Sequence, residues 1–212
     1  MLAKSISFNS LLLGGFALLT AGTLATVNLF TQAPIAEAER AAARKALLEI
    51  LPPATHNNAM LEDTLPLTPE WQQALNAKND AVIYRARKDN DVVGVIIPAT
   101  APDGYSGNIH LIVGINKNLS VAGVRVVAHA ETPGLGDKIE TKKSDWILAF
   151  NETSLDEPAA NHWRVKKDGG HFDQFTGATI TPRAVVRQVK QVIEFAERNH
   201  DVLFRASNEA NP

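Results

Sequence analysis

The sequence is organised around one short segment, Asp173-Gln174-Phe175-Thr176-Gly177-Ala178-Thr179-Ile180-Thr181. The residues after it repeat apolar side chains at helical spacing: Val185, Val186, Val189, Val192, Ile193 and Ala196. Thr181 is a good N-cap residue and Pro182 suits the first helical position, so we expect a helix from Pro182 to about Asn199. The segment therefore lies at a helix N-terminus, where backbone N–H groups and the helix dipole favour an anion such as phosphate.

This motif segment, residues 173–181, allows two interpretations. Gly177 and Ala178 are small, and glycine adopts backbone angles that other residues avoid, so a bulky ligand could approach the main chain. The nearby hydroxyls are those of Thr176, Thr179 and Thr181. The segment is either a strand-to-helix turn with a threonine cap or a covalent or phosphate-binding site. A match this short does not decide between them.

The spacing Asp173-x-x-Thr176-Gly177-Ala178-Thr179 resembles the flavinylation motif of the FMN-binding domain family, Asp-x-x-Ser/Thr-Gly-Ala-Ser/Thr. In that family a flavin transferase joins the phosphate of FMN to the last hydroxyl residue of the motif, which here is Thr179. The resemblance therefore implies FMN as the cofactor, covalently attached to Thr179. It also places Thr176, Gly177 and Ala178 in the cofactor site, and it makes Asp173 part of what the transferase recognises.

A second segment, residues 129–136, reads His-Ala-Glu-Thr-Pro-Gly-Leu-Gly and resembles the Glu-Thr-Pro-Gly-Leu-Gly loop of the same family. We call residues 131–136 the Pro-Gly loop. The resemblance implies that Thr132 and Leu135 contact the flavin ring system, while the turn at Gly134 exposes backbone donors and acceptors. An ordinary surface turn after a strand is the alternative. The presence of both motifs, in the family's order, favours a cofactor site.

Four further residues are candidates for the same site. Glu131 and Lys138 either touch the flavin edge or the phosphate, or they are solvated surface charges. Tyr105 lies in a stretch that resembles a family segment near the flavin, and its alternative role is that of an ordinary residue at the edge of the core. Arg183 would stand in the first helical turn, where a cation opposes the dipole unless it meets an anion, so we consider a phosphate contact.

Composition limits the possible functions. The chain has 212 residues and a net charge of −2, which gives no indication of a nucleic-acid partner. It contains no cysteine, which excludes disulfides, thiolate-bound iron–sulfur clusters and cysteine nucleophiles. The six histidines show no spacing typical of metal ligands, so we expect no metal site. Redox chemistry would then need an organic cofactor.

The N-terminal stretch from Ser5 to Ala36 contains no charged residue, and its core from Leu11 to Phe30 is 20 residues long. At about 1.5 Å per residue, this core can just cross a hydrocarbon layer of about 30 Å. A cleaved signal peptide is the alternative. Because the apolar cores of signal peptides are usually about 7–15 residues long, the length favours an uncleaved, single-pass anchor. The charges on its two sides do not settle its orientation.

Apolar runs between turn residues predict strands near 81–87, 92–97, 109–115 and 121–129, and a further short strand near 163–166. Helices are expected at 36–51, 69–75 and 144–150, and the stretch 99–108 is rich in turn formers. Strands in antiparallel pairs flanked by helices indicate an α+β fold. We therefore expect a membrane anchor at 1–35, a helical linker region at 36–80, an FMN-binding domain with an antiparallel sheet at 81–205 and a polar tail at 206–212.

These observations predict a membrane-anchored flavoprotein subunit. The resemblance implies that its partners are other subunits of a membrane electron-transport complex, which couples electron flow between NADH and ferredoxin to ion movement. It also implies that the domain lies on the periplasmic side of the cytoplasmic membrane and meets a flavin transferase during maturation. The alternative is a cofactor-free extracytoplasmic binding or assembly domain of a membrane complex, in which the motif segment is only a helix cap.

Overall fold

The computed structural model describes residues 2–206, and in the first helix it describes the side chains of residues 6, 8–35, 37, 41 and 44–50. Most of the expected polar tail, 206–212, therefore lies outside the described residues. The chain divides into two compact units, Met1–Arg44 and Lys45–Pro212. Helix α1 (Leu2–Ile50) supplies the first unit and ends in the second. The domain boundaries expected from the sequence stay a prediction.

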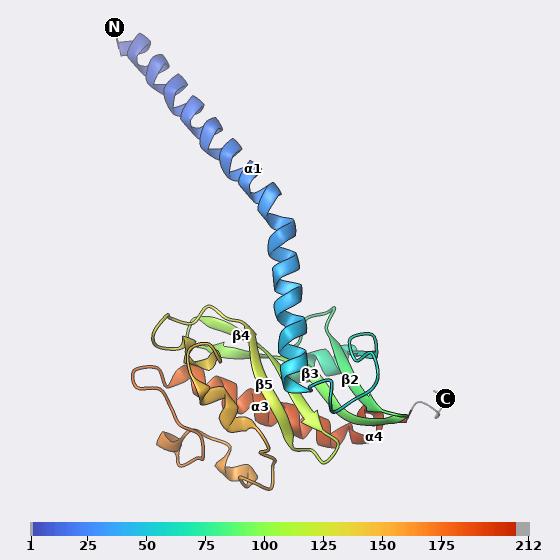
Figure 1. Cartoon of the computed structure of the whole chain (residues 1–212). Helices are drawn as coiled ribbons and strands as arrows, with labels where there is room; N and C mark the ends of the chain where they lie inside the picture. Colours follow the sequence, from blue (N-terminus) through green and yellow to red (C-terminus); the bar gives the residue numbers. More distant parts are fainter. Residues whose placement is uncertain (1, 207–212) are drawn as a thin grey trace. The chain divides into compact units, whose positions relative to one another are not determined.

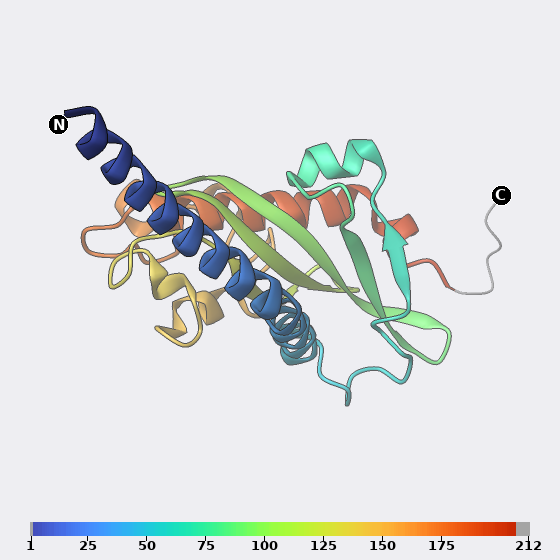
Figure 2. The same cartoon turned by 90° about the horizontal axis from the view of Figure 1, so that it is seen from above.

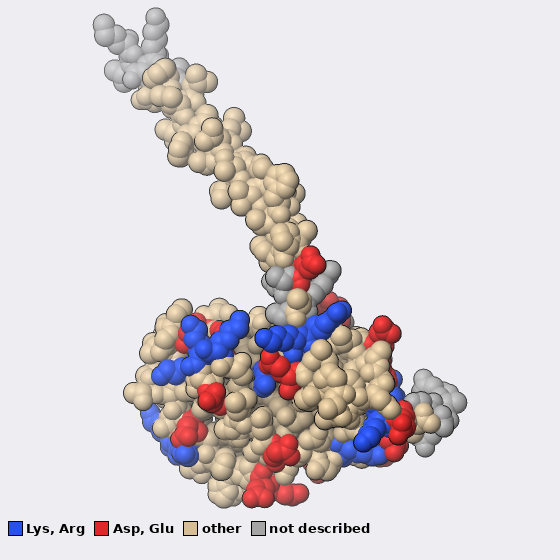
Figure 3. Space-filling model, viewed as in Figure 1, with Lys and Arg blue, Asp and Glu red and all other residues tan. Residues whose placement is uncertain are grey.

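The first unit contains the apolar part of α1. Among the described residues, one helical segment, Phe8–Ile35, is long and apolar enough to cross a membrane, with 28 residues and a mean hydropathy of 1.7. It carries no acidic or basic side chain (Figure 3). The hydroxyls of Thr20, Thr23 and Thr26 donate to carbonyl oxygens four residues earlier, over 2.7–2.9 Å. These hydroxyls therefore form their hydrogen bonds within the helix itself.

The second unit is built on a five-stranded sheet with the order β1-β2-β3-β4-β5, in which every neighbouring pair is antiparallel. The strands are β1 (Thr64–Pro66), β2 (Val82–Lys88), β3 (Asp91–Gly104), β4 (Gly107–Asn116) and β5 (Val121–Ala128). Helix α3 (Ile180–Arg198) runs across one face of this sheet (Figures 1 and 2). The expected α+β fold is confirmed.

The hairpin of β3 and β4 is longer than the sequence predicted. The expectation of a turn-rich stretch at 99–108 is wrong, because β3 continues to Gly104 and only two residues separate it from β4. Ala99 and Ala101 are buried and pair with residues of β4, so these small side chains belong to the core despite the prolines around them. The extension places Tyr105 at the tip of a long hairpin.

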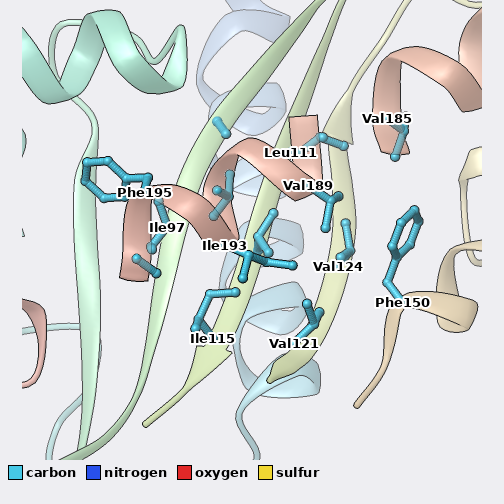
Figure 4. Packing of buried hydrophobic residues seen from close by; sticks show 14 of the residues in the cluster. Ile97, Leu111, Ile115, Val121, Val124, Phe150, Val185, Val189, Ile193 and Phe195 are labelled. Carbon is cyan, nitrogen blue, oxygen red and sulfur yellow. The ribbon is translucent and has the colours of Figure 1, made fainter. Parts of the chain in front are cut away.

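The main core lies between the sheet and α3. Val185, Val189 and Ile193 of α3 point towards the strands, where side chains of β3, β4 and β5 meet them (Figure 4). The residues labelled on the sheet side are Ile97, Leu111, Ile115, Val121 and Val124. All of these residues are almost completely excluded from solvent. The helical spacing seen in the sequence is therefore the face of α3 that covers the sheet.

The other face of the sheet is covered by the end of α1. Leu47, Ile50 and Leu51 pack with Ile96 and other residues of the strands in a second buried cluster. Close approach requires glycine in β4, since a Cβ added at Gly114 would lie 2.1 Å from Cγ2 of Ile50. The last turns of α1 are thus part of the domain.

The segment between β5 and α3 has little regular structure. It contains the short 3₁₀ helices η1 (Asp137–Ile139), η2 (Asp145–Phe150), η3 (Ala160–His162) and η4 (Lys166–Asp168). Elsewhere the short helices are α2 (Pro69–Leu75) and α4 (His200–Leu203). The strand expected at 163–166 is only an isolated bridge between Val165 and Phe172. Aromatic packing replaces backbone ladders here, with the Phe150 and Phe172 ring centroids 4.5 Å apart.

Candidate functional site

The candidate site is a cavity of about 540 Å³ at the N-terminus of α3. It is lined by Tyr105, Glu131, Thr132, Leu135, Gly136, Lys167, Gly177, Ala178, Thr179, Ile180 and Thr181. These residues come from the β3–β4 turn, the Pro-Gly loop, η4 and the motif segment. The two sequence motifs, distant along the chain, therefore meet at one place.

The side chain of Glu131 connects three of these elements. It is buried, with only 4% of its surface exposed. Its Oε1 accepts a hydrogen bond of 2.8 Å from the backbone N–H of Ser106 in the β3–β4 turn. Its Oε2 accepts a short hydrogen bond from the hydroxyl of Thr181 in the first turn of α3. Both carboxylate oxygens thus accept hydrogen bonds that join neighbouring elements of the site. Glu131 is therefore not a solvated surface charge.

Glycines let the elements approach Glu131. A Cβ added at Gly136 would lie 2.9 Å from Glu131 Oε2 and 2.9 Å from Thr181 Oγ1. A Cβ at Gly104 would lie 2.9 Å from Glu131 Oε1. Gly177, with a φ of +83°, has a backbone conformation that favours glycine, and a Cβ there would be 3.7 Å from Cδ2 of Leu135. The Pro-Gly loop and the motif segment therefore pack directly against each other.

The start of α3 differs from the sequence prediction. The helix begins at Ile180 and its N-cap residue is Thr179, so the expectation of Thr181 as the cap is wrong. The side chain of Thr179 makes no capping hydrogen bond and is half-buried in the cavity wall. Thr181 is completely buried because its hydroxyl turns inward to Glu131 rather than to the helix backbone. At Thr181, the hydrogen bond to the buried carboxylate of Glu131 is therefore favoured over a capping hydrogen bond to the helix backbone.

The Thr181–Glu131 hydrogen bond predicts the effect of a substitution. Thr181→Ala leaves a buried carboxylate oxygen without its donor, so we expect a loss of about 1–3 kcal/mol in the free energy of unfolding. Chemical denaturation measures it, with Thr176→Ala as the control because Thr176 is exposed. Equal stability of the two variants would contradict this assignment of the hydrogen bond.

Aromatic side chains fix the position of the motif segment. The indole Nε1 of Trp146 donates a hydrogen bond of 2.7 Å to the backbone oxygen of Asp173. The Trp146 and Phe175 rings pack edge to face with centroids 5.0 Å apart. Phe175 also forms a bridge with Ala178. The residues before Thr179 are therefore fixed against the core although they belong to no helix or strand.

Charged side chains lie around the motif segment. Arg183 donates two hydrogen bonds of 2.6 Å to the carboxylate of Asp168, which explains how a cation is tolerated in the first turns of α3. These hydrogen bonds hold the pKa of Asp168 below its ordinary value, with help from the charges of Lys167 and Arg164, and they raise the pKa of Arg183. Lys166 forms an ion pair of 2.8 Å with Asp173.

The structure brings together seven of the residues selected from the sequence. Those that line the cavity are Tyr105, Glu131, Thr132, Leu135, Gly177, Ala178 and Thr179. Those outside its lining are Gly134, Lys138, Asp173, Thr176 and Arg183. The lining residues that sequence reasoning did not select are Gly136, Lys167, Ile180 and Thr181. Gly136, Ile180 and Thr181 stood in the quoted segments, whereas no pattern marked Lys167.

The properties of the cavity fit FMN. Its volume lies within the range of about 300–1,000 Å³ typical of small-molecule sites. Five large hydrophobic residues are exposed in the described part of the second unit, and three of them line this cavity: Tyr105, Leu135 and Ile180. Such surfaces suit a flat aromatic ring system. The N-terminus of α3 and Lys167 suit a phosphate at the other end of the ligand.

Comparisons with known proteins agree with this fit. The family model of the FMN-binding domain matches residues 104–194, and that of the RnfG N-terminal region matches residues 1–50. The chain is similar to proteins whose names describe the G subunit of an ion-translocating oxidoreductase complex. It is 49% identical to the one from Pseudomonas aeruginosa (95% of this chain, 93% of that protein), 45% to that from Escherichia coli O157:H7 (92% and 92%) and 39% to that from Vibrio cholerae (98% and 97%).

Proposed function

Because this chain belongs to the RnfG family, the G subunits of ion-translocating oxidoreductase complexes, and contains an FMN-binding domain, we propose that it is a membrane-anchored flavoprotein subunit whose FMN is esterified to Thr179. It passes electrons within a complex of this kind and has no substrate of its own. Other subunits of the complex are its permanent partners, and a flavin transferase is its partner during maturation.

One observation carries the attachment proposal. The hydroxyl of Thr179 stands at the N-cap of α3, in the wall of the cavity, without a capping hydrogen bond. A phosphate joined there keeps one negative charge next to the helix N-terminus, which stabilises it. Bound FMN would supply the redox chemistry, since flavins accept and donate electrons. Thr179 would hold the cofactor, and Leu135, an exposed residue of the cavity lining, would contact its ring.

The membrane proposal rests on α1. The apolar segment Phe8–Ile35 is long enough to span a bilayer, and we propose that it remains in the mature protein as a single-pass anchor in the cytoplasmic membrane. The domain would lie on the periplasmic side. A covalent link makes physical sense there, because a lost flavin could not readily be replaced outside the cytoplasm.

The Pro-Gly loop gives a prediction about the flavin ring. Leu135→Ala and Thr132→Ala remove side chains from the cavity wall without touching Thr179. We expect both variants to retain covalent FMN while its absorption spectrum and reduction potential change, because these depend on the polarity around the ring. Lys138→Ala is the matched control, since Lys138 lies outside the lining. Unchanged spectra and potentials in both variants would remove the loop from the flavin site.

The competing function is a cofactor-free binding or assembly domain. Co-expression of the full chain with a flavin transferase separates the two. We expect a yellow protein whose flavin fluorescence stays with the chain in a denaturing gel, because a phosphoester survives unfolding. Colour that is lost on denaturation would indicate bound but unattached flavin. A colourless, folded protein would support the cofactor-free alternative.

A further inference from the structure

Three threonines line the cavity, and two of them, Thr179 and Thr181, belong to the motif segment. The surroundings of these two hydroxyls differ. Thr179 is half-buried and makes no capping hydrogen bond. Thr181 has no exposed surface, and its hydroxyl donates to Glu131 Oε2. The third threonine of the motif segment, Thr176, lies outside the cavity lining. An enzyme that esterifies the segment at the cavity therefore meets two chemically equivalent hydroxyls, and something in the chain must distinguish them.

Building on the proposed function, we propose that Glu131 is the positioning residue that selects Thr179 as the FMN acceptor, by keeping the Thr181 hydroxyl inside the protein. Its carboxylate is fixed on both sides. Oε1 accepts a hydrogen bond of 2.8 Å from the N–H of Ser106, and Gly104 and Gly136 lie so close that a Cβ on either would come within 2.9 Å of one of the two oxygens. Thr181 can therefore turn towards the cavity only if it abandons a buried carboxylate, which costs free energy.

The same contact could be taken for an activated nucleophile, since a carboxylate next to a hydroxyl can remove its proton. Burial excludes that role here. A hydroxyl oxygen must approach phosphorus in line with the leaving group, and the oxygen of Thr181 belongs to a residue with 0% exposure. Glu131 is itself only 4% exposed. The pair is therefore closed to a phosphoryl donor held by another protein.

The transfer step balances for Thr179. Its oxygen forms a bond to the FMN phosphorus of an activated donor in which FMN is joined to a nucleotide through a phosphoanhydride. The anhydride P–O bond breaks, and the displaced nucleotide phosphate leaves with the electron pair. The hydroxyl proton passes to a base of the transferase or to water. No oxidant or reductant is consumed, and Glu131 takes no part in the bond changes.

The test locates the flavin in full-length variants co-expressed with the transferase. Thr179→Ala removes the favoured acceptor, and the double variants Thr179→Ala/Glu131→Ala and Thr179→Ala/Glu131→Asp also release Thr181. The aspartate keeps the charge but is too short to reach both donors. Thr179→Ala/Glu140→Ala is the matched control, because Glu140 accepts a hydrogen bond from His129 and does not contact Thr181. Peptide mass spectrometry gives the attachment site, and thermal unfolding confirms a folded chain.

We expect Thr179→Ala and the Glu140 control to carry no flavin, and both Glu131 double variants to carry flavin on Thr181. Flavin on Thr181 in Thr179→Ala alone would overturn the proposal, and this result does not depend on the folding of the Glu131 variants. Folded Glu131 double variants without flavin would also overturn it. Wild-type chain treated in parallel separates the two claims, since unlabelled wild type contradicts the proposed function itself.

Discussion

Thr179→Ala is expected to give a folded protein that carries no covalent flavin. The substitution removes the acceptor oxygen, whereas the fold loses little, because the Thr179 side chain makes no capping hydrogen bond and is only half-buried. We expect covalent flavin in the wild-type chain and none in the variant. Fluorescence of the denatured chain in a gel measures attachment, and thermal unfolding measures stability.

Two controls sharpen this result. Thr179→Ser keeps a hydroxyl at the same position and should retain the flavin. Thr176→Ala removes a hydroxyl of the same motif that lies outside the cavity lining, and it should also retain the flavin. Covalent flavin in Thr179→Ala would show that another residue is the acceptor.

Removing the apolar part of α1 is expected to abolish NADH-driven electron transfer in membranes that lack the full-length chain. A chain beginning at Ala36 keeps Leu47, Ile50 and Leu51, which pack under the sheet, so its domain should fold and receive FMN. It loses the segment Phe8–Ile35 that we propose as the anchor. A flavin on a freely diffusing domain would exchange electrons inefficiently with a membrane-embedded neighbour.

A second truncation separates anchoring from folding. A chain beginning at Pro52 also lacks Leu47, Ile50 and Leu51, each of which contributes about 1.5–3 kcal/mol when buried, and we expect it to unfold more easily than the chain beginning at Ala36. Full rescue of electron transfer by the Ala36 chain would contradict the anchor. So would a mature natural N-terminus located after residue 30.

The fold class could be predicted from the sequence because the strongest apolar patterns belong to residues that form the core. The apolar spacing of Val185, Val189 and Ile193 predicted the face of α3 that covers the sheet, and apolar runs between turn residues predicted the main strands. The errors arose where tertiary contacts override local preference. Ala99 and Ala101 are too small to signal a strand, yet they are buried against β4.

The sequence predicted the two motifs of the site but not the contacts between their side chains. The resemblance to one family, with both motifs in the family's order, indicated that Thr132, Leu135 and Thr179 belong to the same site. It could not show that Thr181 faces a buried carboxylate, because capping preference and burial compete at the same residue and only packing decides. Lys167 was missed for a related reason. It enters the cavity lining through a segment fixed by aromatic packing rather than by a helix or a strand.

The central claim is that Thr179 bears FMN through a phosphoester, and mass spectrometry of the chain purified from membranes tests it most directly. The account predicts an intact mass greater than that of the unmodified chain by one FMN less one water, and a fragment map that places the addition on Thr179. The account would be contradicted if the folded chain, after co-expression with the transferase, had the unmodified mass. It would also be contradicted if the flavin mapped to any other residue.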